Sequence, residues 1–211
     1  MNSEIFIEPV NLLTLENETG SESVSTLPSP SRLIQVKPHA IHHYYVPPFS
    51  KHPNGCGQAA MATMLTYWGY MNYDPGNAEN LYVNPSSAPD IWGGILGTSW
   101  ERFKQVMEQY GITAYGQNEA RLSVNSAAGK YETLCNWVNA DFPVAVILGN
   151  GELNLGSGAH WAVVVRVSPY NVILANYGNG YYSVSLSDFM KAWMAYWLPG
   201  IHYAGIFAQP K

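Results

Sequence analysis

Two short segments, one in the first third of the chain and one in the last third, constrain the fold most. The first, Asn54–Met61, reads Asn-Gly-Cys-Gly-Gln-Ala-Ala-Met and places Cys56 directly ahead of an apolar segment with helical spacing that runs to Tyr70. The second, Gly158–Val165, reads Gly-Ala-His-Trp-Ala-Val-Val-Val and places His160 at the start of an apolar strand. The sequence therefore predicts a helix that begins at a cysteine and, later in the chain, a strand that begins at a histidine.

Helical patterns come first along the chain, and strand patterns follow. Helices are predicted from Cys56 to Tyr70, from a capping box with Thr98 as N-cap and Glu101 at the third position, and over residues 130–140. A last helix over residues 188–196 is predicted to be capped by Ser187. Strands are predicted over residues 42–46, 143–148, 160–167, 172–176, 181–184 and 202–208. This order predicts the α+β class, with an antiparallel sheet.

The composition fits one folded domain and excludes some partners. A chain of 211 residues that is 47% hydrophobic can bury a sizeable core. Its net charge of -5 and its charged fraction of 12% leave no basic stripe for nucleic acid. No apolar run approaches the ~20 residues of a membrane span, and the first residues lack the pattern of a signal peptide. We therefore expect a cytoplasmic protein or one exported without a general signal. The sequence does not indicate an oligomeric state.

Two segments differ in composition from the predicted elements. Residues 17–31 are rich in Ser, Thr, Glu and Pro. Residues 1–31 are therefore interpreted as a flexible N-terminal arm ahead of a single domain over residues 32–211. Residues 71–97 contain several Gly, Pro and Asn, and we expect them to form a long loop or lid.

The two cysteines are predicted to differ in reactivity. Cys135 shares a helical face with Leu134 and Val138, which is typical of a buried core thiol. One bridge between Cys56 and Cys135 would be no framework for a domain of this size. Unpaired N–H groups and the dipole at the start of a helix favour a thiolate at Cys56, and a neighbouring imidazolium favours it more strongly. The alternative for Cys56 is an inert buried thiol.

His160 is the candidate base and Asn176 the candidate residue that orients it. His160 stands at a strand end, after a glycine-rich stretch. A hairpin with its turn over Ser168–Asn171 would set Asn176 beside His160, although Asn176 alone also fits a turn residue. The other histidines, His39, His42, His43, His52 and His202, are weaker candidates for the base. No metal or other cofactor is expected, because the ligand set around His42-His43 is incomplete and no Cys or carboxylate partner has sensible spacing.

Six motifs, taken in order, resemble the papain-like double-glycine peptidase family, which includes the bacteriocin-processing leader peptidases. They are Val46-Pro47, Cys56–Met61 with Tyr67–Gly69, Phe142–Val146, Gly158–Val165, Val172–Asn176 and Leu186–Trp193. The resemblance implies a papain-like fold, in which an N-terminal nucleophile helix packs on a C-terminal antiparallel β-sheet. It also implies that Cys56 is the nucleophile, His160 the general base and Asn176 the orienting residue, a position that is usually Asp in this family.

One departure from the family concerns the oxyanion hole, the donors that stabilise negative charge on the attacked oxygen. The family usually carries a glutamine shortly before the cysteine, and Ser50, followed by Lys51, occupies that position here. Ser50, Lys51 and Asn54 are the candidate replacements, beside a backbone N–H of the helix. Gln58 follows the cysteine on the helix and is a weaker candidate. Trp161 is a candidate wall of the substrate cleft.

These features predict a thiol hydrolase that cleaves a peptide or isopeptide-type amide through a Cys56–His160–Asn176 triad and a thioester. Its partner is expected to be a peptide or protein substrate. The same triad also serves deamidases, transpeptidases and acyltransferases, and such a domain would suit a bacterial toxin or effector. A non-catalytic peptide-binding domain is the last alternative, and the missing glutamine is its best support.

Overall fold

The computed structural model describes residues 34–35, 55–72, 98–116, 126–153, 158–177, 180–195 and 203–210. Several predictions lie outside these residues. They are the arm over 1–31, the strand over 42–46, nearly all of the loop over 71–97, and the candidates Ser50, Lys51 and Asn54.

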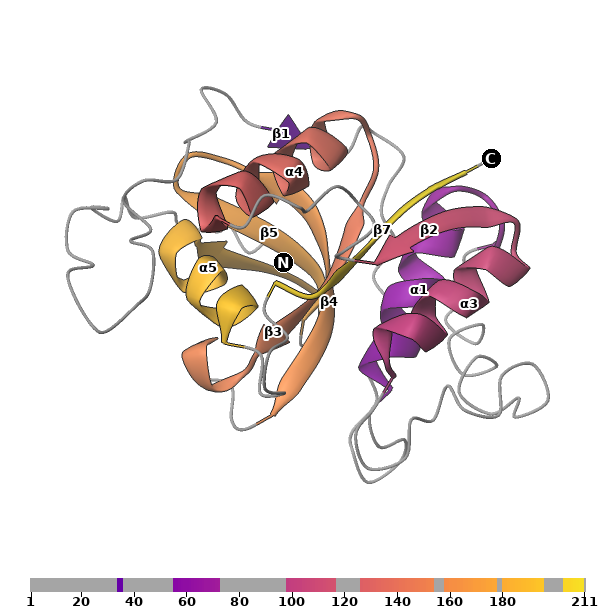
Figure 1. The fold of residues 1–211 in the computed structure, drawn as a ribbon, viewed down its shortest axis with the longest axis horizontal. Helices are drawn as coiled ribbons and strands as arrows, with labels where there is room; N and C mark the ends of the chain where they lie inside the picture. The colour runs from indigo at the N-terminus through magenta and orange to yellow at the C-terminus, as the bar shows by residue number, and fades with distance from the viewer. Residues whose placement is uncertain are drawn as a thin grey trace, which may run out of the picture.

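The described strands form one seven-stranded antiparallel sheet (Figure 1). Its order is β2-β7-β3-β4-β5-β6, and β1 pairs with the far end of β4. The strands are β1 (Ile34–Gln35), β2 (Ile112–Gly116), β3 (Val144–Gly149), β4 (Ala159–Val167), β5 (Asn171–Tyr177), β6 (Gly180–Ser185) and β7 (Gly205–Pro210). Strand β4, which carries His160 near its start, lies between β3 and β5 in the middle of the sheet.

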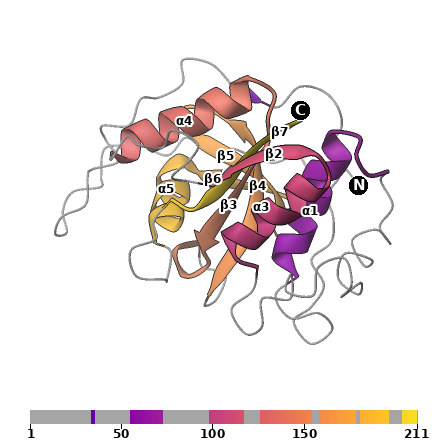
Figure 2. The ribbon, with the colours of Figure 1, turned by 45° about the vertical axis from the view of Figure 1, so that its right-hand side comes forward.

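Helices cover both faces of the sheet. Figures 1 and 2 show α1 (Cys56–Tyr67) with α3 (Trp100–Gln109) on one side, and α4 (Ala127–Asn139) and α5 (Leu186–Met194) on the other. Alternate residues of β3 join the two cores: Val144, Val146 and Leu148 pack with α4 and α5, whereas Ala145 and Ile147 pack with α1 and α3. The strand is therefore apolar throughout, because both of its faces are buried.

The helix α1 is enclosed on nearly all sides. Ten of its 12 residues are buried, so it lacks the polar face of a surface helix. A Cβ on Gly57 would lie 2.4 Å from Thr98 Oγ1. The chain that leads into α3 therefore approaches the first turn of α1 closely, and only glycine fits at this position.

The predicted class is confirmed, and most predicted elements are present. The helix at Cys56, the two helices that follow it and the strands β3 to β7 lie where the pattern placed them, within three residues at most starts. Strand β2 was missed, although its alternation buries Ile112 and Ala114, because five residues carry a weak signal. No helix in the described part of the chain is both long and apolar enough to span a membrane.

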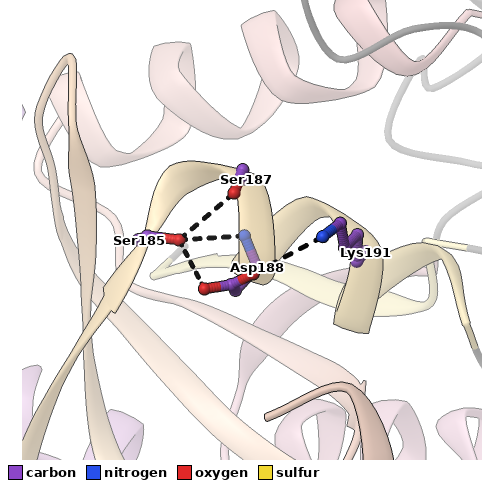
Figure 3. Close-up of polar contacts among 4 residues, drawn as sticks. All are labelled: Ser185, Ser187, Asp188 and Lys191. Carbon is purple, nitrogen blue, oxygen red and sulfur yellow. Dashed lines mark hydrogen bonds and ion pairs between the residues drawn. The ribbon is translucent and has the colours of Figure 1, made fainter. Parts of the chain in front are cut away.

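Two predicted caps are wrong by one or two residues. Ser99, not Thr98, caps α3, and its Oγ accepts the Arg102 N–H. The predicted cap Ser187 lies inside α5, whose N-cap is Ser185 (Figure 3). Ser185 Oγ accepts the Asp188 N–H at 3.1 Å and donates to Asp188 Oδ2 at 2.7 Å. Strand β6 passes directly into α5 at this point, so the helix begins earlier than its apolar pattern indicates.

Candidate active site

Cys56 is the first residue of α1 and is half-buried. The N-cap is Gly55, and no side chain caps the helix. The first N–H groups of a helix have no partner within it, so they are available to an anion at this end. The Gly57 N–H already contacts the thiol and favours its ionised form.

His160 lies on the second residue of β4, and its ring is hydrogen-bonded to the Cys56 side chain. Burial by itself would raise the pKa of the Cys56 thiol. The hydrogen bond and charge of His160, with the backbone N–H groups of Trp161 and Gly57, outweigh burial and lower this pKa below its ordinary value. The pKa of His160 moves the opposite way: burial lowers it, but Cys56 and the Asn176 backbone raise it overall. Both shifts favour a thiolate beside an imidazolium.

Asn176 lies near the end of β5 and contacts His160 and helix α1 through different atoms. Its backbone carbonyl oxygen is 2.5 Å from His160 Nε2. Its side chain is fully buried and points to α1, where Nδ2 donates to the Ala59 carbonyl at 3.0 Å and to Thr63 Oγ1 at 2.6 Å. The structure therefore brings Asn176 beside His160 by its main chain rather than by its amide.

The contacts with Cys56 and His160 arise where the β4–β5 ladder opens. The pairing runs from Val167↔Val172 to Val163↔Ala175 and goes no further. Asn176 follows with φ 60°, a left-handed conformation, and the register of β5 with β6 shifts at the same point. Backbone groups that a longer ladder would use are thereby released, and His160 and Cys56 bind to those of Asn176 and Trp161 respectively.

Gln58 and the Trp161 side chain are both buried. Gln58 is 0% exposed within α1, and Trp161 is 3% exposed. The Trp161 indole N–H donates to the Thr98 carbonyl at 2.8 Å, and its ring packs on Phe103 with the centroids 4.9 Å apart. In this arrangement Trp161 joins β4 to the start of α3 and contributes its backbone N–H to the site.

A sequence model of the Peptidase_C39 like family matches residues 43–197, well over half of the chain. The chain belongs to the Peptidase_C39 like family. The predicted resemblance is thus confirmed, and the protein is a cysteine peptidase-like hydrolase. No curated protein matches the sequence.

Three solved structures are similar to this chain, and the first of them shows the same fold. One described as C39-like, from Bacillus anthracis, shares 15% identity with a TM-score of 0.58, covering 85% of this chain and 98% of that one. The peptidase domain of Streptococcus ComA, a bifunctional ABC transporter in a quorum-sensing pathway, shares 15% identity with a TM-score of 0.48, covering 81% and 100%. A double-glycine-motif protease from an AMS/PCAT transporter, in complex with its leader peptide, shares 16% identity with a TM-score of 0.44, covering 74% and 84%.

The sequence of this C39-like chain does not indicate the roles of two residues near the site. Thr63 stands among the residues whose spacing predicts the buried face of a helix, and nothing local marks its hydroxyl as a partner of Asn176. The Thr98 carbonyl holds Trp161, but the capping pattern directs attention to the Thr98 side chain instead. Both roles depend on contacts between segments far apart in the sequence.

Proposed function

We propose that this protein hydrolyses a peptide or isopeptide-type amide, with Cys56 as nucleophile, His160 as acid and base, and Asn176 as the residue that orients His160. The observation that carries this proposal is the hydrogen bond between the Cys56 thiol and the His160 ring, at the start of a helix. A lowered thiol pKa beside a raised imidazole pKa is the ionisation that a thiol nucleophile needs near neutral pH.

Acylation begins when the Cys56 thiolate attacks the substrate carbonyl carbon. A C–S bond forms and an electron pair moves to the carbonyl oxygen, which becomes an oxyanion. His160 then gives its ring proton to the leaving nitrogen while the oxyanion collapses and the C–N bond breaks. Nε2 faces the Asn176 carbonyl, so Nδ1 is the ring nitrogen on the side of the thiol. The products of this step are a thioester on Cys56, a neutral amine and a neutral imidazole.

Deacylation returns the enzyme to its starting state. The neutral His160 ring takes a proton from a water molecule, whose oxygen attacks the thioester carbonyl. The C–S bond breaks and releases the acid, leaving a thiolate on Cys56 and an imidazolium on His160. The proposed cycle uses Cys56, His160, the oxyanion donors and the carbonyl that orients His160.

The oxyanion needs hydrogen-bond donors, and the first turn of α1 supplies backbone candidates. The Cys56 N–H belongs to the group of N–H donors that an α-helix leaves unpaired at its start, and no side chain caps this helix. A loss of one oxyanion donor typically lowers kcat by ~10²–10³-fold. A second donor from Ser50, Lys51 or Asn54, which precede Cys56, remains part of the proposal.

The test is the pH dependence of iodoacetamide alkylation, followed at each cysteine by mass spectrometry. Cys135 is an internal control, because it is buried and burial raises its pKa to about 11. We expect fast labelling of Cys56 well below pH 8.5, the region of an ordinary thiol pKa, and a loss of that reactivity in His160→Ala. Equal, slow labelling of Cys56 in both proteins would overturn the proposal.

The acceptor that resolves the thioester is tested separately. Incubation with peptide amides and glutamine-containing peptides, with mass analysis of the products, distinguishes the outcomes. Chain cleavage supports the hydrolase, whereas ammonia release without cleavage, or transfer of the acyl group to an added amine, would replace it by a deamidase or a transferase.

A further inference from the structure

The Asn176 side chain joins strand β5 to the helix that carries the thiol. Its Nδ2 is bonded to the Ala59 carbonyl and to Thr63 Oγ1, which lie on α1 about one and two turns after Cys56. Asn176 and Thr63 are both 0% exposed, so water does not compete with these bonds. The three residues therefore fix how far the end of β5 lies from α1.

The atom of Asn176 that reaches His160 is its carbonyl oxygen, and the backbone dihedrals set the direction of that oxygen. Asn176 holds φ 60°, in the left-handed region that non-glycine residues seldom adopt and that Asn tolerates best among them. The two hydrogen bonds from its side chain to α1 stabilise this backbone conformation. If they are removed, the carbonyl loses its fixed place relative to both Cys56 and His160.

We propose that Asn176 positions His160 through its backbone carbonyl, and that its side-chain bonds to Ala59 and Thr63 hold that carbonyl in register with Cys56. Thr63 is then a positioning residue of the active site that acts through Asn176. This inference rests on the proposed function of the Cys56–His160 pair and adds what keeps the two groups aligned.

The arrangement has a consequence for the proton on His160. A carbonyl oxygen only accepts hydrogen bonds, so Nε2 must carry a proton to bind it. In the neutral ring this places the single proton on Nε2 and leaves Nδ1 as the nitrogen that takes the proton from Cys56. If the Asn176 carbonyl moves away, the tautomer with its proton on Nε2 is no longer favoured. A smaller fraction of the neutral His160 rings then presents an unprotonated Nδ1 to the Cys56 thiol.

The first variant is Thr63→Val, which removes the hydroxyl and keeps the shape of the side chain. We expect the alkylation rate of Cys56 at pH 6 to fall by about five- to ten-fold, the effect of one net hydrogen bond. Thr63→Ser keeps the hydroxyl and should restore most of the rate. Thr133→Val is the matched control, because Thr133 Oγ1 donates only within its own helix, to the Gly129 carbonyl at 3.0 Å. This control should alkylate like the wild type.

Substitutions at Asn176 distinguish the contribution of its backbone carbonyl from that of its side-chain amide. Asn176→Gly keeps the carbonyl and tolerates φ above zero, but it lacks the bonds to α1. We expect it to lower the rate about as much as Thr63→Val, and the double variant to fall no further than Asn176→Gly alone. Asn176→Asp should also lower the rate, because a carboxylate would face the Ala59 carbonyl without a hydrogen to donate.

Nitrogen NMR of the His160 ring gives a readout that a loss of stability would not imitate. The wild type should show neutral His160 protonated on Nε2, and Thr63→Val should show a mixture of tautomers at a temperature where it remains folded. Wild-type reactivity in both Thr63→Val and Asn176→Asp, with one tautomer throughout, would overturn the inference and favour an orienting amide. An ordinary thiol pH profile in the wild type would overturn the proposed function instead, so the two failures are distinguishable.

Discussion

Tyr67 Oη donates a hydrogen bond to Asp141 Oδ1 at 2.6 Å. The bond joins the last residue of α1 to the turn between α4 and β3, where Asp141 holds φ 73°. Burial and the neighbouring carboxylate both raise the pKa of the Tyr67 phenol far above its ordinary value, so it stays a donor. The helix is thus fixed at its C-terminal end by Asp141 and near its start by the close approach of Thr98 to Gly57.

We expect Tyr67→Phe to lower the free energy of unfolding by about 1–2 kcal/mol, since it removes one hydrogen bond to a partly buried carboxylate. Urea denaturation followed by tryptophan fluorescence measures the change. Asp141→Asn is the control, because it keeps an acceptor oxygen and tolerates the left-handed backbone, and it should cost less. Equal stabilities of Tyr67→Phe and the wild type would show that the bond contributes nothing net.

The start of α5 offers a matched pair of serines. Ser185→Ala removes the oxygen that accepts the Asp188 N–H, and we expect a loss of about 1 kcal/mol in unfolding free energy. Ser187→Ala lies two residues further on, inside the helix, and should change stability by less than about 0.5 kcal/mol. Thermal and urea unfolding of both variants decide between the cap in the structure and the one that the sequence pattern predicts. A larger loss at Ser187 would contradict the structure.

The contrast between these two serines shows which features a sequence can predict. Periodicity extends over many residues, so β3, β4 and the helix at Cys56 were found from apolar runs alone. A cap depends on one side chain, and Ser185 and Ser187 are equally suitable N-cap residues by type. Only the position at which β6 ends decides between them. The predicted cap therefore differed from the observed one by two residues.

The candidate active site also contains features that the sequence predicts and features that it does not. The spacing of the hairpin predicted that Asn176 would lie beside His160, because the turn over Ser168–Asn171 is local. The sequence could not show which atom of Asn176 would face the ring, since that depends on a left-handed residue at the point where the ladder opens. Thr63 was hidden for a related reason, because its partner lies 113 positions away.

Gly57 gives a prediction about packing next to the thiol. We expect Gly57→Ala to destabilise the protein by about 1–3 kcal/mol, the usual cost of overpacking, because the new methyl would lie 2.4 Å from Thr98 Oγ1. The better helix propensity of alanine offsets at most about 1 kcal/mol of this. Urea denaturation measures the net change.

Relief of the clash is the control for that variant. Thr98→Gly removes both side-chain atoms that the methyl would meet most closely, so Gly57→Ala should cost less in that background than in the wild type. Additive losses in the double variant would show that the first loss has another source.

The pH dependence of peptide cleavage tests the ion pair as a whole. In the proposed mechanism, cleavage requires a thiolate at Cys56 and a proton on His160, so we expect a bell-shaped profile of kcat/KM. The rising limb reflects the lowered pKa of the thiol, below which Cys56 is protonated and inert. The falling limb reflects the raised pKa of His160, above which no proton is left for the leaving amine. Because the groups interact, each limb belongs to the pair rather than to one residue.

Alkylation by iodoacetamide separates the two limbs, because this reaction needs the thiolate and no proton donor. The Cys56 alkylation rate should therefore rise over the same pH range as cleavage and show no falling limb at higher pH. The Thr63→Val variant should shift the rising limb to higher pH in both assays, because a less aligned imidazolium stabilises the thiolate less. A falling limb in alkylation as well would assign the loss at high pH to a change in the protein other than deprotonation of His160.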